Sequence, residues 1–74
     1  MQEDRRPAID ASIVRIMKSR KTMEHTLLVA EVIEQLQLRF KPDPKQIKQS
    51  IENLINREYI ERSASLPGTY IYLA

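Results

Sequence analysis

Side chains suited to acid–base or nucleophilic chemistry are few in this chain. His25 is its only histidine, so a histidine metal cluster is impossible and a catalytic triad would depend on that one residue. Glu31 and Glu34 are close in sequence, but carboxylates at that spacing on a helix usually form a solvated face. The single glycine, Gly68, excludes a glycine-rich phosphate loop. These residues do not support catalysis, and we expect no enzymatic activity, no cofactor and no metal.

A second chemical feature is the cation cluster, which we define as Arg15, Lys18, Arg20 and Lys21. It lies at the end of an apolar, helix-like run. Cations near the C-terminus of a helix interact favourably with the helix dipole and need no other partner. By residue type and spacing alone, Lys18 is therefore one exposed lysine among several.

Composition narrows the class of protein further. The chain has 74 residues, which is at most one small domain, and no cysteine, so disulfides, thiol catalysis and cysteine-bound metals are excluded. The 12 cations and 10 anions leave a mildly basic net charge of +2. The N-terminus is charged and the longest purely apolar run is Leu27 to Ala30, so we expect neither a signal peptide nor a membrane span.

The cation cluster must be positioned by a first helix, which we expect from about Pro7 to Lys21. Pro7 suits the first turn of a helix, and Asp4 or a neighbour is the expected cap. Apolar residues at helical spacing form the expected buried stripe, with Val14 on its shoulder. The stripe consists of Ile9, Ile13, Ile16 and Met17.

A second helix is expected to follow, with Thr26 as its N-cap. Its apolar positions recur at helical spacing, and it should end near Leu38 to Phe40. The Lys41-Pro42 pair stops it, because a residue before proline is pushed out of helical geometry. The apolar positions are Leu28, Val29, Val32, Ile33 and Leu36.

The third helix has the best local signature in the chain. Asp43 is the expected N-cap, Pro44 fits the first helical position, and Gln46 stands where a capping box reaches back. The core stripe that follows runs to about Glu58 and consists of Ile47, Ile51, Leu54 and Ile55.

Two short strands complete the pattern, at residues 59–62 and 69–73, joined by a loop with a Pro67-Gly68 turn. Because an isolated hairpin is marginal in water, it should pack on the helices, with residues 22–25 as a candidate third strand. Three helices and then a hairpin predict an α+β winged helix, a three-helix bundle with a small antiparallel wing, as one domain over residues 1–74.

This fold raises nucleic-acid binding as an alternative function, because the third helix of a winged helix commonly enters the major groove. Glu52 and Glu58 share that helix, however, and the wing has no cation beyond Arg62. An ordinary solvated face is the favoured interpretation. The residues that would contact nucleic acid are Lys45, Lys48, Gln49, Asn53 and Arg57.

The chain also resembles the cullins, the scaffolds of ubiquitin ligases, over nearly its whole length and in the correct order. The matching segments are Asp4-Arg5-Arg6, Ile13 to Lys21, Arg39-Phe40-Lys41-Pro42, Ile47-Lys48, Leu54-Ile55, Glu58 to Arg62, and Tyr70-Ile71-Tyr72-Leu73-Ala74. The resemblance implies the C-terminal winged-helix domain of a cullin, with Ala74 as the natural end. One small departure is Ser12, where many cullins have alanine.

The resemblance also implies a covalent modification. In cullins, the lysine of the Ile-Val-Arg-Ile-Met-Lys motif accepts a ubiquitin-like modifier through an isopeptide bond, and here that lysine is Lys18. The reaction is aminolysis of a thioester held by a conjugating enzyme. By its position near Lys18, we expect the edge formed by Val14, with Arg15 and Lys21, to dock the modifier or an enzyme.

The resemblance finally implies the wider setting. Modification is expected to activate the parent ligase. Expected partners are the neddylation modifier, its conjugating enzyme and the RING-box subunit of the ligase, in the cytoplasm and the nucleus.

Overall fold

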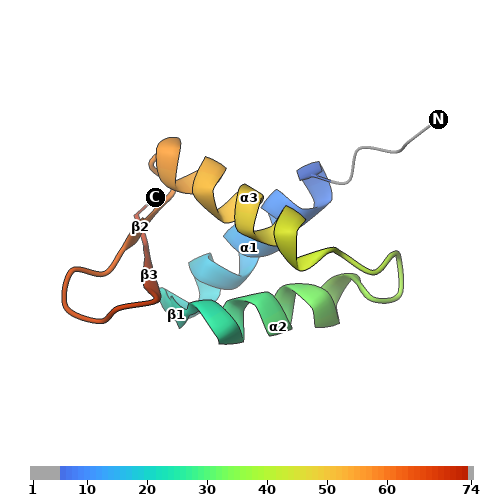
Figure 1. The fold of residues 1–74 in the computed structure, drawn as a ribbon, viewed down its shortest axis with the longest axis horizontal. Coiled ribbons are helices and arrows are strands. Elements are labelled where there is room, and N and C mark those ends of the chain that lie inside the picture. Colours follow the sequence, from blue (N-terminus) through green and yellow to red (C-terminus); the bar gives the residue numbers. More distant parts are fainter. Residues whose placement is uncertain (1–5, 74) are drawn as a thin grey trace.

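The computed structural model describes residues 6–73 as three helices and a three-stranded antiparallel sheet, which confirms the predicted winged helix (Figure 1). The residue 63–68 loop of the wing extends from one end of the helices, and the loop after α2 lies at the opposite end (Figure 1). In chain order the elements are α1 (Arg6–Arg20), β1 (Thr22–Glu24), α2 (His25–Leu36), α3 (Pro44–Asn56), β2 (Ile60–Arg62) and β3 (Thr69–Tyr72).

Helix α1 is the centre of the bundle, because it packs against both α2 and α3. The four predicted stripe residues are all buried, with Ile9, Ile13 and Met17 fully inaccessible to solvent. Pro7 lies in the first turn as predicted. The expected cap, Asp4, falls outside the described residues.

Helix α2 begins differently from the prediction. Thr26 is not its N-cap, because the helix already begins at His25, and the residue in the cap position, Glu24, makes no side-chain cap hydrogen bond. Strand β1 leads directly into the helix, and the His25 amide donates to the Gly68 carbonyl at 2.7 Å. The wing therefore substitutes for a side-chain cap. The regular helix ends at Leu36, earlier than expected.

Helix α3 begins as the sequence predicts. The Asp43 carboxylate accepts from the Lys45 amide at 2.9 Å, and the Gln46 side chain accepts from the Asp43 amide at 3.5 Å. Pro44 occupies the first turn. This complete capping box satisfies amides that have no partner within the helix.

Removing the Asp43 cap should weaken the domain measurably. We expect Asp43→Ala to lower the free energy of unfolding by about 0.5–2 kcal/mol, because the first-turn amides lose their acceptor. Urea unfolding followed by circular dichroism measures this change. The matched control is Glu34→Ala, an exposed carboxylate of α2, which should change stability by less than about 0.5 kcal/mol. Equal effects of the two substitutions would show that the cap is not stabilising.

The sheet has the strand order β1-β3-β2, so the C-terminal strand lies in the middle. Tyr70 of β3 lies opposite Met23 of β1 on one side and opposite Arg62 of β2 on the other. Residues 22–24 thus form the third strand that the wing was expected to need.

The core is formed by all three helices and three buried residues of the sheet, Met23, Ile60 and Tyr70. Within residues 6–73, no helix is both long and apolar enough to cross a membrane.

Candidate functional site

Three members of the cation cluster are held by other side chains. The Arg15 guanidinium donates to Gln35 Oε1 at 3.3 Å, and the Arg20 guanidinium contacts a Glu31 carboxylate oxygen at 2.6 Å. Lys21 Nζ lies over the Tyr72 ring, 5.2 Å from its centroid. The partners on α2 and β3 are distant in sequence, so no local pattern could have indicated them.

Lys18 differs from its neighbours. It is exposed on the last turn of α1, and within the described part of the chain its amine has no hydrogen-bond or ion-pair partner. The buried residues Ile16 and Met17 just before it fix the rotation of the helix. The fold therefore presents the Lys18 amine to solvent from a rigid element.

Lys18 lies at an open groove of about 470 Å³ between α1 and the C-terminal end of α3. Val14 and Arg15, two of the predicted docking residues, also line this groove, and the third, Lys21, does not. The contribution from Leu54 and Tyr59 depends on how α1 packs on α3, so the sequence pattern gave no sign of it. The full lining is Asp10, Ala11, Val14, Arg15, Lys18, Leu54, Arg57 and Tyr59.

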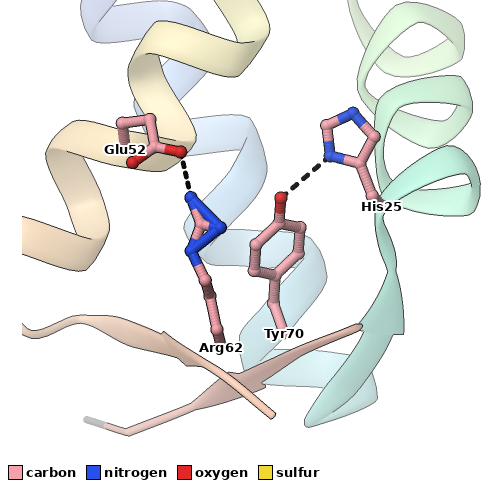
Figure 2. A network of polar contacts seen from close by, with 4 residues as sticks. All are labelled: His25, Glu52, Arg62 and Tyr70. Atoms are coloured by element: carbon pink, nitrogen blue, oxygen red, sulfur yellow. Dashed lines mark hydrogen bonds and ion pairs between the residues drawn. The ribbon is translucent and has the colours of Figure 1, made fainter. Parts of the chain in front are cut away.

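The sole histidine belongs to a structural contact. His25 Nδ1 lies 2.9 Å from the Tyr70 hydroxyl, and the two rings meet edge to face with centroids 5.9 Å apart. Figure 2 shows Tyr70 pointing from β3 toward His25 at the start of α2. This contact ties the wing to the bundle. Among residues 6–73, no group of three potential metal ligands comes together.

Tyr70 gives this contact a dependence on pH. Burial raises the pKa of the Tyr70 hydroxyl above its usual value of 10.0, and the Arg62 charge opposes that shift. A group whose pKa is higher in the folded state stabilises the fold to its full extent when the pH is below the unfolded-state pKa. That contribution is lost as the pH rises through the folded-state pKa.

We expect Tyr70→Phe to cost about 0.5–1.5 kcal/mol at neutral pH, because the hydrogen bond to His25 is lost. The difference from wild type should shrink as the pH rises above about 10, since only the wild-type chain has a phenol to ionise at this position. Urea midpoints measured across that range test both statements. A difference that stays constant with pH would contradict the linkage.

The surface that would meet nucleic acid is only partly available. Lys45, Lys48 and Gln49 are exposed on α3. Arg62, the cation next to the wing loop, pairs instead with Glu52 of α3 (Figure 2), and the hydrogen bond and charge of Glu52 raise the Arg62 pKa. The cation nearest the wing loop is therefore paired within the domain, and a carboxylate lies between the helix and the wing.

Comparison with known proteins identifies close relatives. Residues 4–65 match the family model described as the cullin protein neddylation domain. The whole chain is 58% identical to Cullin-3 of Dictyostelium discoideum, 60% to Cullin-1 of Oryza sativa subsp. japonica and 55% to Cullin-2 of Arabidopsis thaliana. It spans 10% of the length of each of these relatives.

A solved structure shares the fold. It is described as "A Dual E3 Mechanism for Rub1 Ligation to Cdc53: Dcn1(P)-Cdc53(WHB)", and the similarity has a TM-score of 0.90 at 38% sequence identity. The match covers 95% of this chain and 80% of the other. The similarity thus extends over both the helices and the wing.

Proposed function

Since the chain belongs to the cullin family through its neddylation domain, we propose that Lys18 is the acceptor of a ubiquitin-like modifier. The observation that carries this proposal is the contrast within the cation cluster. Arg15, Arg20 and Lys21 have partners on other elements, whereas the described structure gives the Lys18 amine none. Of the cluster's two lysines, Lys18 is thus the one whose amine has no partner among the described residues.

The proposed step is aminolysis. The neutral Lys18 amine attacks the thioester carbonyl that joins the modifier's C-terminal glycine to a conjugating-enzyme cysteine. A C–N bond forms, the C–S bond breaks, and the cysteine leaves as a thiolate while the amine loses a proton to a base. Lysine side chains in water are almost fully protonated at neutral pH, so the conjugating enzyme must provide the deprotonation. The domain contributes position, because a rigid helix holds the amine at a defined place.

The groove beside Lys18 is the proposed docking surface for the modifier or its enzyme. Its walls are mainly apolar, and its charged lining residues besides Lys18 are Asp10, Arg15 and Arg57. Val14 is half-buried there and offers an apolar contact next to the acceptor. Contact at such a surface would orient the thioester toward the amine.

We expect Val14→Asp to slow modification about tenfold, because a carboxylate would have to be desolvated in an apolar contact, as at a typical interface hot spot. The initial rate of adduct formation measures this effect. Ala30→Asp, on the exposed surface of α2, is the control and should react at the wild-type rate. Equal rates for both variants would show that the groove is not the docking surface.

The wider role rests on the resemblance to cullins. We propose that this is a non-catalytic domain at the C-terminus of a ligase scaffold, acting with a RING-box subunit in the cytoplasm and nucleus. Modification would shift the population between a docked, restrained arrangement of this domain and a free one. Activation of the ligase then follows from release of the RING subunit.

The test is intact mass after reaction with the modifier and its enzymes, with the domain joined to its RING-binding scaffold. A single adduct supports the proposal. Absence of an adduct overturns it and makes the nucleic-acid alternative the next test, as salt-dependent DNA binding that Lys45→Ala and Lys48→Ala would abolish.

A further inference from the structure

Two lysines of the cation cluster compete for one reaction, and exposure alone does not separate them. Lys18 and Lys21 are both exposed and only three residues apart. A flexible modifier tail that reaches Lys18 would therefore also come close to Lys21. The proposed docking groove favours Lys18, which lines it, and a second device can act on the position of the Lys21 head group.

The backbone of Lys21 is fixed on both sides. Its amide donates to the Met17 carbonyl at 2.7 Å, and its carbonyl accepts from the Tyr72 amide at 2.8 Å. Its φ of 70° is left-handed, a conformation that residues with side chains rarely adopt. Lys21 thus ends α1 and turns the chain into β1, with little freedom to move.

The strand register places an aromatic ring beside this residue. Thr22 pairs with Ile71, so the next antiparallel position sets Lys21 opposite Tyr72. Side chains of directly opposed residues lie within contact distance. The Lys21 amine accordingly lies 5.2 Å from the Tyr72 ring centroid, in the range of a cation–π interaction.

We propose that Tyr72 selects the acceptor by holding the Lys21 amine against its ring and so withholding it from the thioester. The inference rests on the proposed function and deepens it. To form its own isopeptide bond, with the same loss of a thiolate and a proton, the Lys21 amine must first leave the ring. Lys18, which has no such partner among the described residues, meets no such requirement.

The first test needs no conjugating enzyme. The domain is acetylated with an N-hydroxysuccinimide ester, and the rates at Lys18 and Lys21 are compared by peptide mass. We expect Tyr72→Leu to raise the Lys21-to-Lys18 rate ratio about two- to fivefold, the strength of an exposed cation–π contact. Tyr72→Phe keeps the ring and should leave the ratio unchanged. An unchanged ratio in Tyr72→Leu overturns the inference.

The wild-type chain provides a measurement that does not depend on a variant's folding. The ring current of Tyr72 should shift the Lys21 ε-methylene protons upfield relative to those of Lys18. Lys21 should also be acetylated more slowly than Lys18. Equal shifts and rates in wild type would overturn the inference.

The enzymatic reaction completes the test. In Tyr72→Leu we expect the share of adduct at Lys21 to rise about two- to fivefold over wild type. A share of adduct at Lys21 no larger than in wild type overturns this inference and leaves the proposed function standing. A wild-type chain with no adduct overturns the proposed function, and this inference with it.

Discussion

Lys18→Arg is expected to reduce the modifier adduct to background. Arginine keeps the positive charge and the helix propensity of lysine, so the fold should be unchanged. A guanidinium stays protonated in proteins and has no free electron pair to attack a thioester. The loss should therefore be complete rather than partial. Intact mass after reaction on the RING-binding scaffold measures it.

The matched control is Lys48→Arg, which makes the same change at an exposed lysine of α3. It should be modified to the wild-type extent. The scaffold is included in every reaction, so that the proposed RING subunit can recruit the conjugating enzyme. An adduct of undiminished yield in Lys18→Arg would mean that another lysine is the acceptor.

Ile13→Ala is expected to have the largest effect on stability. Ile13 has no exposed surface and lies in the stripe of α1, the helix that contacts both others. Truncating a fully buried isoleucine costs about 2–5 kcal/mol. A domain of this size has only about 4–11 kcal/mol in total, at roughly 0.05–0.15 kcal/mol per residue. The variant should melt at least about 10 °C lower, as measured by thermal unfolding.

Leu38→Ala provides the control, since it removes the same number of carbon atoms from a residue that is 96% exposed. Its unfolding free energy should stay within about 0.5 kcal/mol of wild type. Similar melting temperatures for the two variants would contradict the assigned core. Because Lys18 is presented by α1, loss of Ile13 should also lower the yield of adduct at temperatures where the domain unfolds.

Elements governed by neighbouring residues could be predicted from the sequence. The start of α3 follows from Asp43, Pro44 and Gln46, which interact within one turn, and the structure has the predicted capping box. The buried stripe of α1 follows from helical periodicity, because burial depends only on which face carries apolar residues. The order of these elements was sufficient to predict the winged helix.

Features governed by distant residues could not be predicted in the same way. Thr26 has the residue type of an N-cap, but pairing of the neighbouring strand with β3 starts α2 two residues earlier. The contact of Lys21 with Tyr72 depends on strand register across half the chain. Without that contact, Lys18 and Lys21 are indistinguishable by composition and spacing.

The acceptor lysine and the groove beside it differ in how far the sequence could predict them. The choice of Lys18 came from resemblance to a family, and the residues alone left it as one lysine among several. The structure adds a physical difference between the two lysines. The Lys21 amine lies over the Tyr72 ring, and the described residues give the Lys18 amine no partner. The groove beside it required the packing of α1 on α3.

Locating the isopeptide bond in the modified wild-type chain decides whether Lys18 is the acceptor. The adduct is digested with a protease, and the branched peptide that retains the modifier's C-terminal residues is sequenced by tandem mass spectrometry. We expect the main branched peptide to have its branch at Lys18, with Lys21 modified to a smaller extent. A branch at Lys21, Lys41, Lys45 or Lys48 in place of Lys18 would contradict this expectation.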